Sequence, residues 1–507
     1  MTCPLCNKTM CDHSPTQRGQ SSEEMMRDYF LGAGSKKMPK RKKINLVEVR
    51  ATEGGVGAGC RSQEPIGLSI IGGYLAQKGV DVNIVCSTIQ NPDITPERAL
   101  AGSPDYIGIS CFVNDLLEVK SFADRIKRIS PLTKVIVGGN GVLTEPAEVS
   151  RHPSIDLVVK GEGVYPLEDI INEHSEVRGL VFQNGKLIHN NPTRTNLDET
   201  GIPLRTKEMM QNRKRVDLTN PAPSVQKYAT LHTSAGCNNH CSFCQTQEMF
   251  PGGIRFRDPE NVLREVEECQ SKYGTNYMLL MDPVAFGGVA GLKSGHAKRC
   301  ADLLQDTGMR FYALTRLDMP SQYWDILKRA GVSKVGVGIE SLIQRGIKDG
   351  TPEMQLQKIT RYGEEAIKRG ILCRGLFMVG YEGQTPDDIK RETESLTQLQ
   401  NITDIRIGWY NPFEKTQREV EEMYSRGETY TSNISKKDTN HPFLKIQGIS
   451  EKQAQAVKTN MYRAFYKCGN ADDAAKKIVC VDSSLKQSYD EFNRNVLAKI
   501  GCQIKYD

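Results

Sequence analysis

Short apolar runs alternate with amphipathic stretches of helix length along most of this chain, and this alternation limits the folds open to it. In the first series the expected strands are residues 44–49, 82–85, 106–110, 135–137 and 156–159, and the expected helices are residues 66–77, residues 116–129 and a helix after Pro166. Strands joined by helices in this order pair in parallel, and the helices cover both faces of the sheet. We therefore expect residues 44–175 to form a doubly wound, Rossmann-like α/β domain.

A second series begins near residue 228 and has more repeats than the first. Its expected strands are residues 277–281, 311–315, 334–339, 373–378 and 405–410, with helices that begin near Pro259, Ser294, Gln322, Met354 and Pro386. Counting the strand before Cys237, this makes six βα units, fewer than the eight of a closed barrel. Residues 226–413 are therefore expected to form a partial (β/α)6 barrel whose active face lies at the carboxyl ends of its strands.

The other segments flank or connect these two domains. Residues 1–43 are interpreted as a polar N-terminal extension, and residues 414–507 as a small helical C-terminal region. Residues 176–225 are interpreted as a linker that contains a β-hairpin, because Asn184-Gly185 is a favoured two-residue turn between two apolar runs.

The composition restricts the class of protein further. Hydrophobic residues make up 38% of the chain and charged residues 25%, and no run reaches the roughly 18 apolar residues of a membrane helix. The first residues lack the pattern of a signal peptide, so we expect a cytoplasmic protein without a membrane partner. The net charge is +6, and the basic run from Lys36 to Lys43 is expected to be a solvated linker, with a nucleic-acid-binding arm as the alternative.

The cysteines contain the clearest chemical signal. With 15 cysteines in a long chain without a signal peptide, reduced thiols are expected, some of them metal ligands. Cys237, Cys241 and Cys244 form a C-x3-C-x2-C pattern just after the first expected barrel strand. Such a loop can bind three irons of a [4Fe–4S] cluster and leave the fourth iron open to a substrate. A structural zinc site with His240 or His232 as the fourth ligand is the alternative.

These cysteines, with the aromatic Phe243 before the third, resemble the hallmark of the radical S-adenosylmethionine (radical SAM) superfamily. The resemblance implies that the open iron binds S-adenosylmethionine and that one electron, from a donor such as flavodoxin or ferredoxin, cleaves it to a 5′-deoxyadenosyl radical. It also implies cofactor contacts along residues 228–413, with strand-end packing as the alternative for each. The implied residues are Phe243 and Gly380 near the adenine, Arg316 and Ser341 near the methionyl or ribose groups, Glu340 beside Ser341, and Asp282 as a substrate or amine contact.

Residues 64–171 resemble the cobalamin-binding domain that precedes the radical domain in one branch of that superfamily. Small residues at strand ends leave a crevice for a cofactor, here Ser110, Gly138, Gly139 and Gly161, with further glycines at 54, 55, 57 and 59. Glu162, beside Gly161, is a further candidate for cofactor binding. The chain has no Asp-x-His-x-x-Gly motif after the first strand, so no lower axial histidine is expected from that loop; Arg50, Cys60 and Arg61 are the local alternatives. A nucleotide-binding sheet without cobalamin is the other interpretation of the glycines.

Together the two resemblances imply a cobalamin-dependent radical SAM enzyme, and in particular a C-methyltransferase that acts on an unactivated carbon of a small molecule or peptide. Cyclisation, ring rearrangement or another radical reaction, with or without cobalamin, is the alternative. A cobalamin or iron–sulfur sensor that binds nucleic acid is a third hypothesis, from a different class.

A second group of possible metal ligands lies at the N-terminus. Cys3, Cys6, Cys11 and His13 offer four ligands within 11 residues, enough for a tetrahedral zinc knuckle. The alternative is an unstructured arm with ordinary thiols.

Overall fold

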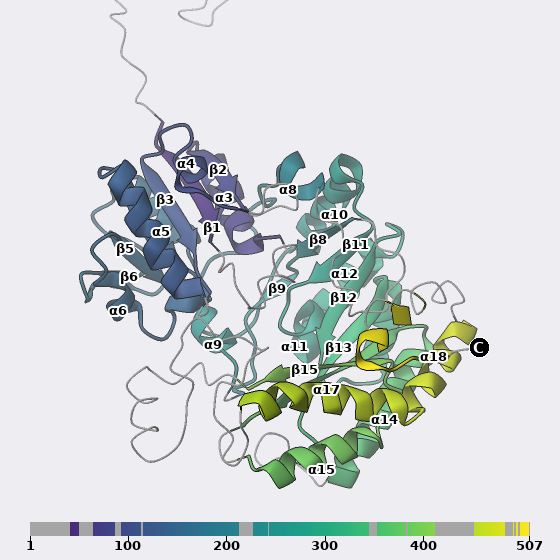
Figure 1. Ribbon diagram of the computed structural model, residues 1–507. Coiled ribbons are helices and arrows are strands. Elements are labelled where there is room, and N and C mark those ends of the chain that lie inside the picture. Colours follow the sequence, from purple (N-terminus) through teal and green to yellow (C-terminus); the bar gives the residue numbers. More distant parts are fainter. Residues whose placement is uncertain are drawn as a thin grey trace, which may run out of the picture. The chain divides into compact units, whose positions relative to one another are not determined.

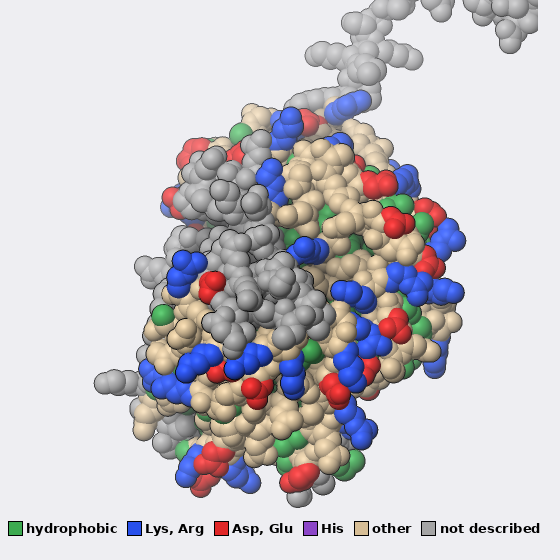
Figure 2. All heavy atoms as spheres, turned by 90° about the vertical axis from the view of Figure 1, so that its right-hand side faces the viewer, with side chains coloured by type: hydrophobic (Ala, Val, Ile, Leu, Met, Phe, Trp, Pro, Cys, Tyr) green, Lys and Arg blue, Asp and Glu red, His purple; other side chains and the backbone are tan. Residues whose placement is uncertain are grey.

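The computed structural model describes residues 41–49, 64–86, 93–112, 115–211, 227–241, 243–343, 352–381, 384–410, 451–481, 490, 493–494 and 497–505. The N-terminal cysteine group and the glycine-rich segment at 50–63, with its arginines and Cys60, lie outside these residues. Of the basic run, Lys42 pairs with Glu173 and Lys43 with Asp81. On the face that Figure 2 draws, Lys and Arg side chains are mixed with Asp and Glu side chains.

The first sheet has seven strands in the order β2-β1-β3-β4-β5-β6-β7 (Figure 1). Its strands are β1 (Lys43–Glu48), β2 (Asp81–Val85), β3 (Tyr106–Ser110), β4 (Lys134–Gly138), β5 (Leu157–Lys160), β6 (Gly179–Gln183) and β7 (Lys186–Asn191). The helices beside it are α3 (Ile66–Gln77), α4 (Pro96–Ala99), α5 (Leu116–Ile129), α6 (Pro146–Ser150) and α7 (Val164–Ile171). Strands β1 to β5 pair in parallel, as the alternation predicts.

Two expectations about this domain need correction. The hairpin of β6 and β7 is not part of a free linker, because β6 pairs antiparallel with β5 and extends the sheet. The sheet is therefore mixed rather than wholly parallel. Helix α7 begins at Val164 and not after Pro166; proline is tolerated there because the first-turn N–H groups have no partner within a helix.

The second sheet has six strands in the order β15-β14-β13-β12-β11-β8, all paired in parallel. The strands are β8 (Tyr228–Leu231), β11 (Tyr277–Leu280), β12 (Arg310–Thr315), β13 (Val332–Glu340), β14 (Leu372–Val379) and β15 (Asp404–Trp409). The principal helices between them are α10 (Pro259–Tyr273), α12 (His296–Leu304), α13 (Gln322–Arg329), α14 (Pro352–Lys368) and α15 (Pro386–Leu396). This is the predicted set of six βα units, with β8 and β15 as its two edges.

Helix α17 (Glu451–Lys467) packs against β15, the far edge of this second sheet, and helix α18 (Asn470–Val481) packs against α17 and α14 (Figure 1). The hydroxyls of Tyr462 and Tyr466 accept hydrogen bonds from the backbone N–H groups of Ile407, at 3.0 Å, and Ile405, at 3.4 Å. The C-terminal helices therefore cover the open edge of β15 and use side chains in place of a seventh strand. Among the described residues, no helix is long and apolar enough to cross a membrane.

Candidate active site

A cavity of about 640 Å³ lies at the carboxyl ends of the strands of the first sheet. One wall consists of those strand ends and the beginning of α3, and residues 195–203 contribute a second wall. The opposite wall comes from the barrel domain and includes His232, Phe243, Cys244 and Arg257. The cavity therefore reaches both the predicted cofactor crevice of the sheet and the predicted cluster loop.

The strand-end residues named from the sequence all line this cavity: Ser110, Gly138, Gly139, Gly161 and Glu162. Gly139 has a left-handed φ of 97°, and a Cβ there would lie 2.7 Å from the carbonyl oxygen of Cys111. A side chain at this position would collide with the backbone after β3, so glycine keeps the crevice open.

Glu162 has a structural partner as well as a place in the cavity wall. Its Oε1 lies 2.7 Å from Nη2 of Arg255, and its Oε2 accepts a hydrogen bond from the Thr195 N–H at 3.3 Å. Arg255 belongs to β10 (Arg255–Phe256), which pairs with β9 (Ser234–Ala235) just before the cysteine loop. Glu162 therefore ties the end of β5 to the base of that loop.

Asp282 holds the first part of the cysteine loop in place. Its Oδ1 accepts hydrogen bonds from the N–H groups of Thr233, at 2.8 Å, and Ser234, at 3.1 Å. Its Oδ2 accepts from the hydroxyls of the same two residues. The side chain is fully buried, so the structure places Asp282 as a support of the loop, and the substrate or amine contact expected from the sequence stays a prediction.

The cysteine loop itself begins at Gly236, where φ is 84° and a Cβ would lie 2.3 Å from the Gly253 carbonyl oxygen. The Cys237 sulfur accepts hydrogen bonds from the backbone and side-chain nitrogens of Asn239, at 3.4 and 3.2 Å. Cys237, Cys241 and Cys244 are not in disulfides, and Cys244 is exposed. Hydrogen bonds to the ligand sulfurs are among the contacts that surround an iron–sulfur cluster.

The described residues contain no group of three His, Cys, Asp or Glu side chains placed to hold a single metal ion. A zinc site needs four ligands around one ion. In a [4Fe–4S] cluster each thiolate binds a different iron, so the ligands stand apart around the cluster. The C-x3-C-x2-C order of the loop cysteines is compatible with such a cluster.

Arg316, at the end of β12, faces this loop. Its guanidinium pairs with Asp318 at 3.0 Å. Burial acts to lower the pKa of Arg316, but the hydrogen bond and charge of Asp318, together with the Cys241 sulfur, raise it above its ordinary value. The predicted residue therefore lies beside a predicted iron ligand.

The other predicted barrel residues lie away from the cavity lining. The Ser341 hydroxyl donates to Glu392 at 2.5 Å, and that carboxylate also accepts from the Leu342 N–H at 2.9 Å. Glu340 has a positive φ of 70° at the end of β13, a conformation that costs energy for a non-glycine residue and often occurs at functional sites. Gly380 has a φ of 87°, and a Cβ there would lie 2.9 Å from the Trp409 ring. Cofactor contact by these residues stays a prediction.

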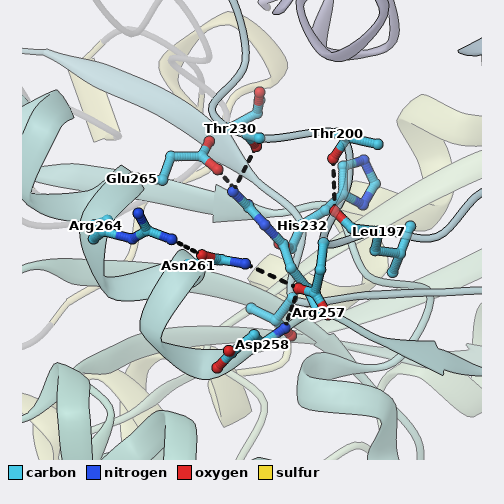
Figure 3. Close-up of polar contacts among 12 residues, drawn as sticks. Leu197, Thr200, Thr230, His232, Arg257, Asp258, Asn261, Arg264 and Glu265 are labelled. Carbon is cyan, nitrogen blue, oxygen red and sulfur yellow. Dashed lines mark hydrogen bonds and ion pairs between the residues drawn. The ribbon is translucent and has the colours of Figure 1, made fainter. Parts of the chain in front are cut away.

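The sequence analysis missed a buried ionic network beside the cavity. Nε of Arg205 lies 2.6 Å from Glu64, and its Nη2 lies 2.6 Å from Glu265, which also pairs with Arg257. All four side chains are at most 6% exposed (Figure 3 labels Glu265 and Arg257). Burial acts to raise the pKa of Glu265, but the two arginines lower it below its ordinary value. Only contacts between distant segments reveal this network, so no local motif could have found it.

His232, one residue beyond β8, was named from the sequence only as a possible fourth zinc ligand, and the structure places it in the cavity wall. It lines the cavity, and its Nδ1 has no hydrogen-bond partner within the described part of the chain. Burial lowers the pKa of the imidazole, so the neutral form is favoured. The sequence signal was its place at the carboxyl end of a barrel strand, where active-site residues of such barrels lie.

Family models match both the cysteine loop and the strand-end residues of the first sheet. Residues 231–396 match the family model of the Radical SAM superfamily, and residues 62–171 match the model of the B12 binding domain. The chain is a radical SAM enzyme with a B12-binding domain. The radical SAM match includes the whole cysteine loop, and the B12 match includes Ser110, Gly138, Gly139, Gly161 and Glu162.

Two relatives and two solved structures illustrate this radical SAM and B12-binding architecture. An uncharacterized methyltransferase of Pyrococcus horikoshii is 25% identical over 386 residues, 72% of this chain and 79% of the relative. The anaerobic magnesium-protoporphyrin IX monomethyl ester cyclase of Rubrivivax gelatinosus is 21% identical, over 69% of this chain and 64% of the relative.

OxsB with aqua-cobalamin bound has a TM-score of 0.64 at 15% identity, and the match covers 91% of this chain and 81% of the OxsB chain. TsrM from Kitasatospora setae, with cobalamin and a [4Fe-4S] cluster bound, has a TM-score of 0.59 at 16% identity, over 84% of this chain and 89% of its own. At these identities the solved structures show the shared fold.

The residues of this chain fit the two cofactor types that its domains imply. For cobalamin, the fit rests on Gly139, where a Cβ would collide with backbone, and on a cavity bounded by small residues at strand ends. For a cluster, the fit rests on three cysteines of one loop that form no disulfide, with N–H donors beside Cys237 and a guanidinium beside Cys241. Phe243 and Cys244 line the same cavity as the strand-end glycines.

Proposed function

We propose that this chain is a cobalamin-dependent radical SAM C-methyltransferase that modifies an unactivated carbon of a small molecule or peptide. The observation that carries the proposal is the single cavity lined both by the strand-end residues of the B12-binding domain and by Phe243 and Cys244 of the cysteine loop. A radical formed near the loop and a methyl donor held at the strand ends would then meet in one enclosed space.

Each residue set has a distinct role in this proposal. Cys237, Cys241 and Cys244 would hold the cluster, and Ser110, Gly138, Gly139 and Gly161 would hold cobalamin. When bound, the cluster with S-adenosylmethionine supplies a radical that removes hydrogen from carbon, and cobalamin supplies a methyl group. Arg316 would stabilise negative charge beside the cluster loop, and Asp282 would fix the direction in which that loop leaves β8. An electron donor such as flavodoxin or ferredoxin would reduce the cluster.

The named relatives support methylation. They include the methyltransferase of Pyrococcus horikoshii and the hopanoid C-3 methylase of Methylococcus capsulatus, which is 21% identical over 58% of this chain. Ring closure is the second candidate, because the cyclase of Rubrivivax gelatinosus is similar to this chain over 69% of its residues. The two candidates differ in how much S-adenosylmethionine they consume and in what they release from it.

The experiment measures those products under anaerobic conditions. The protein is reconstituted with iron, sulfide and hydroxocobalamin, reduced, and incubated with methyl-labelled S-adenosylmethionine, alone and with a small-molecule extract of its source cells. Radical methylation predicts one 5′-deoxyadenosine and one S-adenosylhomocysteine for each labelled product. Labelled product without matching deoxyadenosine would contradict radical methylation, and deoxyadenosine without homocysteine product would favour ring closure.

Two cysteine variants test the site independently of any substrate. Cys241→Ala is expected to lose the cluster iron and to form no deoxyadenosine from S-adenosylmethionine alone. Cys468→Ala is the matched control, because Cys468 is not in a disulfide and lies between α17 and α18, outside the loop. Equal iron content in both variants would refute the assignment of the loop.

A further inference from the structure

Residues 195–205 link the B12-binding domain to the barrel, and they contribute to the cavity wall through Thr195, Leu197, Thr200, Gly201 and Pro203. We refer to them as the 195–205 segment. From the sequence, this stretch was expected to be part of the linker at residues 176–225. In the structure it makes hydrogen bonds or ion pairs to both domains.

The first half of the segment is held from both sides. On the B12 side, Glu162 accepts from the Thr195 N–H at 3.3 Å, and the Tyr165 hydroxyl accepts from the Asn196 N–H at 3.1 Å. On the barrel side, Arg255 donates to the Thr195 carbonyl oxygen.

The turn at Asp198 is fixed by the start of α10. Its Oδ1 accepts from the Asp258 N–H at 2.6 Å and from Asn261 Nδ2 at 3.1 Å (Figure 3 labels Asp258 and Asn261). Beyond it, the Leu204 N–H donates to the Ser69 carbonyl oxygen at 2.7 Å, so the segment also crosses helix α3. The segment thus touches α3 and α10, one from each domain.

The second half ends at Arg205, which is 2% exposed. Its guanidinium contacts Glu64 just before α3, Glu265 in α10 at 2.6 Å, and the Thr230 carbonyl oxygen in β8 at 2.9 Å. Arg257 donates to the Gly201 carbonyl oxygen at 3.0 Å and also pairs with Glu265. One buried side chain of the segment therefore binds acidic groups from both domains.

Removal of one partner from a buried charge network leaves the remaining charges unpaired, which is strongly unfavourable. Here, loss of the arginine would leave Glu64 and Glu265 without their shared cation, although Glu265 would keep Arg257. The segment would then lose its strongest attachment close to the cavity wall at Gly201 and Pro203.

We propose that the 195–205 segment is a cobalamin-retaining strap, and that Arg205 locks it across the mouth of the B12 crevice as a positioning residue. The inference rests on the proposed function in one respect, that cobalamin occupies this cavity. The strap acts on the rate of cobalamin release, because it forms a wall that must move before a large ligand can leave.

The test measures release of bound cobalamin, not turnover. Wild type and Arg205→Met are loaded with hydroxocobalamin, freed of excess ligand, and mixed with an excess of a cobalamin-scavenging protein while the visible spectrum is followed. Methionine keeps much of the arginine volume without the charge. We expect release on the order of tenfold faster from the variant, with the cluster absorbance unchanged.

Leu197→Ala is the second variant, in case Arg205→Met does not fold. It removes an apolar part of the strap wall and leaves every ion pair intact, so faster release is expected here too. Lys334→Met is the matched control, since Lys334 is a buried cation that pairs with Asp404 inside the barrel and does not line the cavity.

The outcomes separate the strap from the proposed function. A wild-type chain that binds no cobalamin would overturn both. Wild-type binding with unchanged release from Leu197→Ala, or from a folded Arg205→Met, would overturn the strap alone. Equal acceleration in Lys334→Met would also overturn it, because the effect would then follow general destabilisation of the chain.

Discussion

Substitution of Asp282 offers a sharp test of how the cysteine loop is held. In Asp282→Ala, four hydrogen bonds from Thr233 and Ser234 lose their acceptor in a fully buried site. The two hydroxyls can turn to other partners, but the two backbone N–H groups cannot. An unsatisfied buried donor costs about 1–3 kcal/mol, so the two together cost about 2–6 kcal/mol. Against a total stability of about 5–15 kcal/mol, this loss is large.

Asp282→Asn should have a smaller effect. The amide oxygen can still accept from the two backbone N–H groups, and its nitrogen can donate to the hydroxyls once these rotate. What is lost is the charge on the acceptor, and charge-assisted hydrogen bonds are roughly twice as strong as neutral ones. We expect a destabilisation of about 1–2 kcal/mol and a cluster content close to that of wild type.

The assays are denaturant unfolding and iron content after anaerobic reconstitution. Asp302→Ala is the control, because the Asp302–Arg329 pair is about 40% exposed on both sides and should change stability by less than about 1 kcal/mol. If Asp282→Ala unfolded at the wild-type denaturant concentration and bound wild-type iron, the supporting role of this carboxylate would be refuted.

Two further predictions concern buried charges in the barrel. Burial raises the pKa of Glu392 despite its hydrogen bonds from Ser341 and Leu342, so the native state holds this proton more tightly than the unfolded chain does. Stability from this group is therefore present at low pH and lost as pH rises through the raised pKa. Glu392→Gln should lack that decline when unfolding is followed from acid to neutral pH. A parallel pH dependence in wild type and Glu392→Gln would contradict this. Asp404 pairs with Lys334 at 2.6 Å and with Arg374, and all three side chains are buried. Asp404→Asn should destabilise the chain by about 3–5 kcal/mol in denaturant unfolding. A loss below about 1 kcal/mol would show that water reaches these ion pairs.

Much of the fold could be predicted because periodicity is a local property. Helices at residues 66–77 and 116–129 and the strand at 106–110 match the structure at both ends. The hairpin was recognised from Asn184-Gly185, but its place in the first sheet was not, since pairing of β6 with β5 depends on a partner that no turn residue specifies.

The candidate site also has features that are local in the sequence and features that depend on distant contacts. The thiols and glycines could be found because their spacing or backbone conformation is itself the functional feature. The supporting role of Asp282 could not be found from sequence spacing, because the N–H and hydroxyl donors to its carboxylate come from a neighbouring strand end. Ser341 contacts Glu392, more than 50 residues further along the chain. Such contacts decide what a side chain does, and they exist only once the sheet has formed.

Tyr462 and Tyr466 of α17 cover a strand edge at which two copies of this protein could otherwise associate. A barrel that stops at six strands leaves the outer backbone of β15 able to recruit a strand from another molecule. Tyr462 and Tyr466 occupy the N–H groups of Ile407 and Ile405 that such a strand would need. The C-terminal helix therefore does for an incomplete barrel what closure does for a complete one, because it removes a template for aggregation. At the other edge, the backbone of β8 is bonded through Thr230 to Glu64 and Arg205.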